Sequence, residues 1–331
     1  MLIAAAASLL LAAGSAQDTS TAALRSELAR IARESGGHVG IAAIHVETGR
    51  MVQLDGGEGF QMQSVFKLPL GILVLRRAEA GQPSLDAMIA VTAADLRPGH
   101  SPIADQHPAG GVRYTVRELL RRAVSESDNT AADLLMRQVG GPAAVTRDLR
   151  QMGIRGVRVD RGEGNLALDV RGIPRGPGRE TRAVADSLGA RVPREVRAHA
   201  FAAYLRDPRD TATPLEMARL LVLLQRGRAL GPRGTAELLR MMTETSNPAR
   251  LNALLPAGTV VAHKTGSSGE FEGVTGVVND VGLVTLPDGT HLAAAVFVRQ
   301  ARRGTAPAER AIARIGRAVY GHWAARRPAR R

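Results

Sequence analysis

The stretch GFQMQSVFKLPLGILVLRR, residues 59–77, contains one of only two lysines in the chain. Of the 44 Lys and Arg residues, 42 are arginines, and the exceptions are Lys67 and Lys264. In Ser64-Val-Phe-Lys67 the serine and lysine are three residues apart, so a helix would place them on one face. A serine hydroxyl becomes an effective nucleophile when a neighbour takes its proton. Burial and a second cation can lower the pKa of lysine enough for that role, whereas arginine keeps its proton.

Two further polar clusters follow along the chain. Lys264 stands in HKTGSSG, residues 263–269, at the end of a predicted strand, where glycines would let a substrate backbone approach closely. Ser127-Asp128-Asn129 lies in VSESDNTAADLL, just inside a helical pattern. Taken singly, each cluster has an ordinary explanation: a lysine reaching solvent, a lysine opening a turn, or a helix N-cap. The order S-x-x-K, S-D-N, K-T-G is far more specific than any one of them.

This ordered set resembles that of class A β-lactamases and penicillin-binding proteins. The resemblance covers about residues 24–322 and includes FQMQSVFKLPL, SPIADQHP, TVRELLRRAVSESDNTAADLL, LPAGTVVAHKTG and NDVGLVTLPDG. The sequences around Ser64 and Lys264, with Asp133 after the S-D-N box, are most similar to the PER-like branch of class A. The resemblance implies hydrolysis of penicillins and cephalosporins through a serine acyl-enzyme, by a monomer that uses no cofactor and no metal.

The resemblance also implies roles for individual residues. Ser64 would be the acylated nucleophile, Lys67 its proton-transfer partner, and Ser127 the proton donor to the leaving lactam nitrogen. The backbone N–H groups of Ser64 and Ser267 would form the oxyanion hole. The implied substrate-binding residues are Asn129, Lys264, Thr265, Gly266, Ser267, His100 and Arg250. Arg250 is also explained as a surface arginine, because arginine is so common in this chain.

Hydrolysis of the acyl-enzyme needs a base for water, and VDRGEGNLALDV supplies a candidate. Arg161, Glu163 and Leu166 match the family's R-x-E-x-x-L pattern on its Ω loop. A glutamate of ordinary pKa is ionised at neutral pH and can accept a proton from water. Two positions depart from the family: Gly164 replaces a proline, and Ala167 replaces an asparagine that helps to hold the water.

Other carboxylates bear on the same loop. Arg161 and Asp210 occupy the positions of the family's loop-closing ion pair, and Asp133 is a further structural candidate. Asp133 or Asp169 could help to position the water in place of the missing asparagine. The long segment between Glu163 and Pro214 indicates a remodelled loop that would suit bulky cephalosporin side chains.

An alternative interpretation of the sequence is a penicillin-binding-protein-like DD-peptidase, or a protein that is acylated by β-lactams and deacylates slowly. Both relatives form an acyl-enzyme at Ser64, so the S-x-x-K motif does not separate them. Glu163 favours the hydrolase, because a peptidase would have no use for it.

Hydrophobic periodicity predicts an α+β fold, and the resemblance implies that it is of the β-lactamase/transpeptidase type. A helix is expected over 21–35, two strands over 38–54 with a turn at Glu47–Arg50, three strands over about 259–298 with a turn at Pro287–Gly289, and a last helix over Ala306–Ala325. We expect residues 17–63 and 226–331 to form an α/β lobe with an antiparallel sheet. An all-helical lobe, 64–225, would be inserted, with an extended Ω region over about 160–212. Within that region, 171–199 reads as a long surface excursion, and 194–206 as a short helix.

The first residues and the amino-acid composition limit the location and the binding partners expected for the protein. Residues 1–16 resemble a signal peptide cut after Ala16, which predicts a periplasmic or secreted protein without stable membrane association. The chain has no cysteine, so no disulfide or thiolate site exists. Its net charge of +13 comes from arginines scattered along the chain, and aromatic residues are only 3%, so nucleic-acid binding is disfavoured. None of the eight histidines has metal-site spacing.

Overall fold

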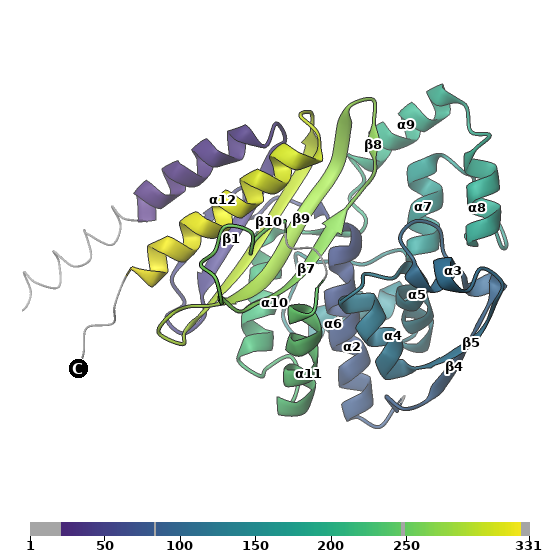
Figure 1. Cartoon of the computed structure of the whole chain (residues 1–331), viewed down its shortest axis with the longest axis horizontal. Coiled ribbons are helices and arrows are strands. Elements are labelled where there is room, and N and C mark those ends of the chain that lie inside the picture. Colours follow the sequence, from purple (N-terminus) through teal and green to yellow (C-terminus); the bar gives the residue numbers. More distant parts are fainter. Residues whose placement is uncertain (1–20, 83, 246–248, 326–331) are drawn as a thin grey trace, which may run out of the picture.

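The computed structural model describes residues 21–82, 84–245 and 249–325, so the expected signal peptide lies outside the described residues. Strands from both ends of the described chain form one antiparallel sheet in the order β2-β1-β10-β9-β7, with β8 paired to β9 (Figure 1). The strands are β1 (His38–His45), β2 (Met51–Leu54), β7 (Val261–Ser267), β8 (Glu270–Phe271), β9 (Val274–Thr285) and β10 (His291–Ala301). The predicted α+β class and the origin of the sheet are confirmed.

Alternation along the strands explains why helices cover both faces of this sheet. Ala295 and Phe297 of β10 face a core shared with α10 (Pro214–Gln225), which contacts β1, β9 and β10. Val296 and Val298 face the opposite core, shared with helix 21–34 and α12. In Figure 1 helix 21–34 and α12 (Thr305–Ala324) lie side by side over that face. The terminal helices expected at 21–35 and 306–325 are therefore confirmed.

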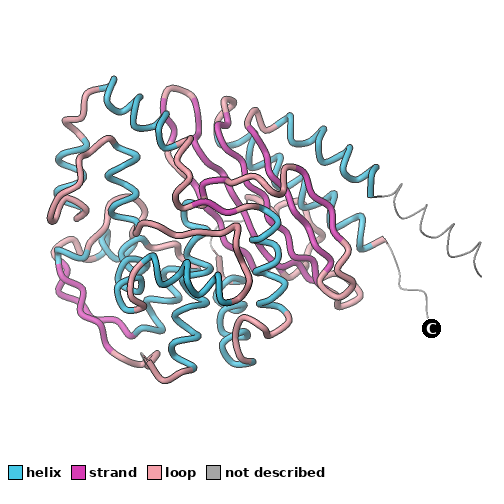
Figure 2. Tube along the Cα trace, turned by 180° about the vertical axis from the view of Figure 1, so that it is seen from behind, coloured by secondary structure: helices cyan, strands magenta, loops and turns pink. Residues whose placement is uncertain are grey.

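The inserted lobe is mostly helical, and Figure 2 shows it from behind, beside the sheet. Its elements are η1 (Gln63–Phe66), α2 (Lys67–Glu79), η2 (Ala93–Asp95), α3 (Pro102–Gln106), α4 (Val116–Val124), α5 (Asn129–Gln138), α6 (Pro142–Gln151), α7 (Glu163–Arg171), α8 (Arg182–Gly189) and α9 (Arg194–Tyr204). Helix α11 (Pro232–Thr243) packs against α2, α4 and β7.

The insertion is not all-helical, which corrects one detail of the prediction. β4 (Met88–Thr92) and β5 (Gly110–Thr115) form a two-stranded sheet, and β3 (Phe60–Gln61) pairs with β6 (Thr211–Ala212). β3 and β6 have two residues each, and Val91 is the only buried residue of β4 and β5, so these strands give little apolar pattern in the sequence.

The segment 171–199 is also more ordered than its Gly, Pro and Arg content predicts. It includes α8, whose Ala185 packs with Leu168 and Ile173 in a small apolar cluster. The short helix predicted over 194–206 is confirmed as α9, which contacts α7. Tertiary packing between three helices therefore orders a stretch that is weakly apolar along the chain.

Helix α2 positions the S-x-x-K motif. Its residues from Lys67 to Leu75 are all buried, and it contacts α4, α5, α6 and α11. Pro69 lies in the first turn, where its missing N–H costs no helical hydrogen bond. Ser64 lies in the 3₁₀ turn η1 just before it, and residues three apart eclipse in such a turn. Ser64 and Lys67 therefore lie on one face where η1 joins α2, as expected.

Candidate active site

The Ser64 hydroxyl lies within hydrogen-bond distance of one donor, Lys67, and one acceptor, Glu163. The Lys67 Nζ lies 3.0 Å from Ser64 Oγ, and Glu163 Oε1 lies 3.3 Å from the same oxygen. Glu163 Oε1 is also 2.8 Å from Lys67 Nζ. Lys67 is fully buried and Glu163 is 5% exposed. Serine, lysine and glutamate therefore form one contiguous group in which Lys67 and Glu163 are shielded from solvent.

The remaining contacts of Lys67 orient its amine. Lys67 Nζ donates to the Ser127 carbonyl oxygen and to Asn129 Oδ1, both at 2.7 Å. These two acceptors account for two N–H donors of the amine, which leaves the third position facing Ser64 and Glu163. A lysine that has passed its third proton to Glu163 would present a lone pair to the Ser64 hydroxyl.

Ser127 and Lys264 form a second pair. Ser127 has φ of 61°, a left-handed conformation that is uncommon for a residue with a side chain and typical of strained functional sites. Its Oγ accepts a hydrogen bond from Lys264 Nζ at 2.9 Å. Burial, reinforced by the charge of Lys67, lowers the pKa of Lys264 from 10.5 to about 7. The two lysines of the chain therefore lie on the same site.

Gly266 permits β7 to lie directly against η1. A Cβ at this position would lie 2.4 Å from the Met62 carbonyl oxygen and 3.2 Å from the Val65 nitrogen. The close approach expected at this glycine is thus to the protein's own backbone. It brings Ser267, at the end of β7, towards Ser64, whose N–H belongs to the first turn of η1 and lacks a helical partner.

Arg250 is buried behind the end of β7, so the description as a surface arginine is wrong. It is 2% exposed, and its Nη2 donates to Ser267 Oγ at 2.6 Å. Its Nη1 donates to the carbonyl oxygens of Gly266 (3.1 Å) and Asn279 (2.6 Å), and its Nε pairs with Glu309 at 3.2 Å. The guanidinium therefore holds Ser267 in place from within the protein.

The turn that carries Glu163 is held by Asp133. Asp133 Oδ1 accepts the Glu163 N–H at 2.7 Å, and Oδ2 accepts the Gly164 N–H at 3.1 Å. Arg97 Nε donates to Asp133 Oδ2 at 2.8 Å. These bonds use both carboxylate oxygens of Asp133, so its place is at the backbone of Glu163.

Asp169 is likewise engaged elsewhere. Arg161 pairs with Asp210 at 2.5 Å, Asp169 at 2.7 Å and Asp207 at 2.9 Å, while Arg175 also binds Asp169. Burial alone would lower the pKa of Arg161, but these carboxylates outweigh it and raise the pKa above its ordinary value. The predicted ion pair of Arg161 with Asp210 is present, as part of a larger cluster.

A cavity of about 280 Å³ opens over Ser64. Its lining residues are Gln63, Ser64, Pro98, Gly99, His100, Asn129, Glu163, Leu166, Ala167, Val170, Arg171, Ser267, Ser268 and Gly269. His100 is an exposed member whose Nε2 lies 2.8 Å from the Glu126 carbonyl oxygen. The short Ala167 side chain leaves room beside Glu163.

Several residues that support this site carry no signal in the sequence. Gln63 has a backbone φ of 48°, and its side-chain amide donates a hydrogen bond to the hydroxyl of buried Tyr204 on α9. Asn279 Nδ2 donates to the carbonyl oxygens of Gln61 (2.8 Å) and Met62 (3.1 Å), which fixes β3 and η1 against β9. Each contact spans more than 140 residues of chain, so local patterns could not have predicted it.

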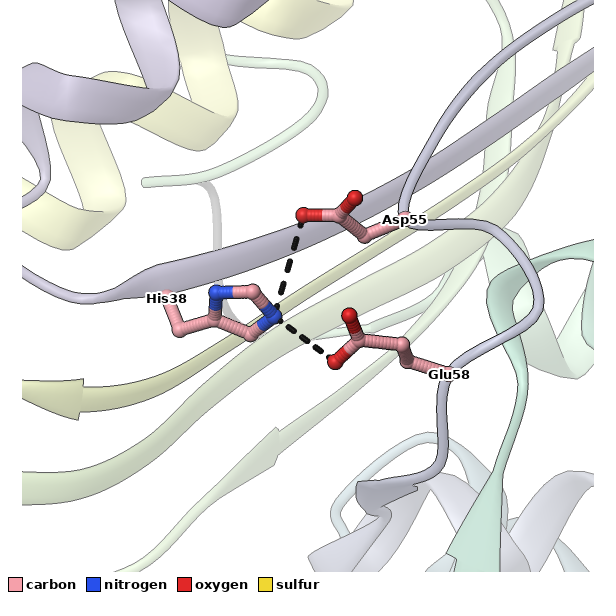
Figure 3. A group of neighbouring side chains, drawn as sticks. All are labelled: His38, Asp55 and Glu58. Carbon is pink, nitrogen blue, oxygen red and sulfur yellow. Dashed lines mark hydrogen bonds and ion pairs between the residues drawn. The ribbon is translucent and has the colours of Figure 1, made fainter.

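One group among the residues that the structure describes has donors close enough to hold a metal ion (Figure 3). His38 Nε2 lies 2.9 Å from Glu58 Oε2 and 3.7 Å from Asp55 Oδ2. Arg299 already pairs with Glu58 at 3.1 Å. All three side chains are partly exposed, and the cavity at Ser64 is lined by other residues. The group is accounted for as a surface ion-pair cluster.

Comparisons with known proteins find related sequences and structures. A family model described as "Beta-lactamase enzyme family" matches residues 23–323. The extended-spectrum beta-lactamase PER-1 of Pseudomonas aeruginosa is 34% identical over 265 residues, covering 80% of this chain and 75% of that protein. A solved beta-lactamase from Chitinophaga pinensis DSM 2588 matches with a TM-score of 0.76 and 35% identity, over 90% of this chain and 98% of that one. An ancestral class A beta-lactamase matches with a TM-score of 0.73 and 33% identity, over 89% and 98%.

Proposed function

The chain belongs to the beta-lactamase enzyme family, and from this membership we propose that Ser64, Lys67 and Glu163 perform the hydrolysis through an acyl-enzyme. The protein is a beta-lactam-hydrolysing enzyme of the serine class A type, and its activity gives resistance to these antibiotics. One observation carries the assignment of roles: both Lys67 and Glu163 lie within 3.3 Å of the Ser64 hydroxyl.

Acylation begins with loss of the Ser64 proton to Lys67 or Glu163. Ser64 Oγ then attacks the lactam carbonyl carbon, and the C–N bond of the ring breaks. The departing nitrogen takes a proton from Ser127, whose oxygen accepts a hydrogen bond from Lys264 and regains a proton along it. The proton that Ser64 gave up balances the proton that the nitrogen gained. The N–H groups of Ser64 and Ser267 stabilise the oxyanion, a contribution of about 3–4 kcal/mol per donor in related acyl transfers.

Deacylation uses Glu163 as the base. It takes a proton from a water molecule, whose oxygen attacks the Ser64 ester and releases the opened product. The space beside Ala167 would admit this water. The position of Glu163, in contact with both Ser64 and Lys67, supports a hydrolase over a peptidase that stops at the acyl-enzyme.

Substrate recognition rests on the other end of the site. Lys264, Thr265 and Ser267 would bind the carboxylate of the substrate, with Arg250 holding Ser267. Asn129 would meet the amide side chain, and His100 lies at the rim. Lys264 is the cation of this group, and its depressed pKa is expected to rise when a carboxylate binds.

The described residues include no helix long and apolar enough to cross a membrane. Export through a signal peptide ending at Ala16 remains part of the proposal. It would bring the enzyme to the compartment where β-lactams reach their targets.

Turnover of a chromogenic cephalosporin by the purified protein tests this function. Colour that develops steadily over many equivalents of substrate is expected. A single burst equal to the enzyme concentration would instead identify a penicillin-binding protein or a slowly deacylating binder.

Replacing Lys67 by arginine is expected to be nearly as damaging as replacing it by alanine. Charge is retained, but the guanidinium does not give up its proton. General-base effects are about 10²–10⁴-fold, so Lys67→Arg should lower kcat/KM by a factor in that range. Steady-state kinetics of the arginine and alanine variants measure this. If the arginine variant keeps more than a few per cent of native activity, a loss of about twentyfold or less, the proton-transfer role is contradicted.

Arg250→Ala is expected to raise KM more than it lowers kcat. The substitution removes the donor to Ser267 Oγ, so the residue that binds the substrate carboxylate loses its support. A five- to twentyfold rise in KM corresponds to about 1–2 kcal/mol, which spans the upper range of a neutral and the lower range of a charged hydrogen bond. Because Arg250 also pairs with Glu309, Glu309→Gln serves as the control and should leave KM unchanged. An unchanged KM in Arg250→Ala would assign the arginine to stability alone.

A further inference from the structure

The glutamate that serves deacylation is held in place by another carboxylate. Asp133 accepts the backbone N–H groups of Glu163 and Gly164 at 2.7 Å and 3.1 Å. Asp133 and Glu163 are both poorly exposed, with side chains 12% and 7% accessible. Asp133 on α5 and Glu163 at the start of α7 are two carboxylates with little hydration. Lys67 pairs with Glu163, so Asp133 needs a cation of its own.

Arg97 supplies that cation in a fixed position. Its Nε donates to Asp133 Oδ2 at 2.8 Å, and the residue is only 6% exposed. The Arg97 N–H donates to Thr130 Oγ1 at 3.0 Å, and its Nη1 donates to the Ala94 carbonyl oxygen at 2.9 Å. With both its backbone and its guanidinium tied down, Arg97 holds Asp133 rigidly against the turn.

Gly164 makes room for this contact. A Cβ at position 164 would lie 2.9 Å from Arg97 Cδ, 3.1 Å from Arg97 Nε and 2.8 Å from Glu180 Cβ. A side chain or a proline ring there would push the guanidinium away from Asp133. Arg97, Asp133 and Gly164 therefore act as one unit around the backbone of Glu163.

We propose that Arg97 is a positioning residue for deacylation, acting through Asp133 to keep the Glu163 carboxylate in place beside Lys67 and Ser64. The inference rests on the proposed role of Glu163 as the base for water. Without Arg97, the unpaired Asp133 carboxylate would draw water into the turn or move away, and the backbone bonds that aim Glu163 would weaken. Acylation at Ser64 depends much less on this turn.

Steady-state kinetics of Arg97→Gln separate this role from a loss of folded protein. In an acyl-enzyme mechanism kcat/KM reports the steps up to acylation, while slow deacylation lowers kcat and KM together. We expect kcat and KM to fall by the same factor, about tenfold or more, with kcat/KM within about threefold of native. Mass spectrometry should show the accumulated acyl-enzyme. A decrease of kcat and kcat/KM at constant KM, without an adduct, would overturn the inference.

A double variant tests the charge pairing. Asp133→Asn alone leaves the Arg97 charge buried without its partner, and Arg97→Gln alone leaves the Asp133 charge without its partner. Breaking a buried ion pair in this way is more damaging than removing both charges. Combining the two substitutions should therefore restore kcat to at least about threefold above Arg97→Gln. Simple addition of the two losses would contradict the pairing.

Two further variants serve as a matched control and as a substitute for Arg97→Gln. Arg137→Gln removes a nearby arginine that pairs with Asp95 at 2.6 Å, and it should leave kcat and KM unchanged. If Arg97→Gln does not fold, Gly164→Ala displaces the Arg97 side chain while keeping both charges. The same joint fall in kcat and KM is expected there, and native kinetics would overturn the inference. Failure of Glu163→Gln to trap an acyl-enzyme would instead contradict the proposed role of Glu163, on which the inference rests.

Discussion

Replacing Ser64 by alanine is expected to abolish both turnover and covalent labelling by a penicillin. Loss of the nucleophile in a comparable serine hydrolase costs about 10⁶-fold in kcat. The chain offers no substitute, since only Ser64 stands three residues before a lysine: the residue three before Lys264 is Val261. Nitrocefin hydrolysis and electrophoresis after labelling with a fluorescent penicillin measure the two effects.

Ser125→Ala is a suitable control for this experiment. Ser125 is a buried serine of the same lobe, and its hydroxyl donates to the Met241 carbonyl oxygen. This variant should still be labelled with native stoichiometry. Labelling that persists in Ser64→Ala would mean that another residue is the nucleophile, and the assignment of the site would be wrong.

Replacing Glu163 by glutamine is expected to trap the acyl-enzyme. Glutamine keeps the size and the hydrogen bonds of the side chain, but it does not take a proton from water. Deacylation should slow by about 10²–10⁴-fold, while acylation, which Lys67 can still assist, should fall far less. Intact-protein mass spectrometry should show a long-lived species heavier by one opened β-lactam.

Asp169→Asn tests the alternative that Asp169 helps to position the water. Because Asp169 is occupied by Arg161 and Arg175, this variant should lose stability without trapping an adduct. Near-native turnover of Glu163→Gln without an adduct would contradict the role of Glu163. Deacylation would then have to depend on Lys67 or on another carboxylate.

The sequence by itself determined the class of the fold and the residues that meet at the site. Strand alternation and helical spacing are local properties, so the sheet strands near both ends of the chain and the terminal helices could be predicted. The two lysines could be singled out for a chemical reason, because a buried lysine, unlike an arginine, can release a proton at neutral pH. The structure brings both of them to Ser127.

Only the tertiary structure decided how Arg250 and Arg97, two of the 42 arginines, serve that site. The sequence left Arg250 open between a substrate contact and a surface residue and gave no signal for Arg97, yet both are buried and paired. Tyr204 reaches Gln63 from a helix that the sequence pattern only weakly predicted. Burial and ion pairing of such residues depend on contacts between segments far apart in sequence, and the free energy of those contacts has no counterpart in local periodicity or spacing.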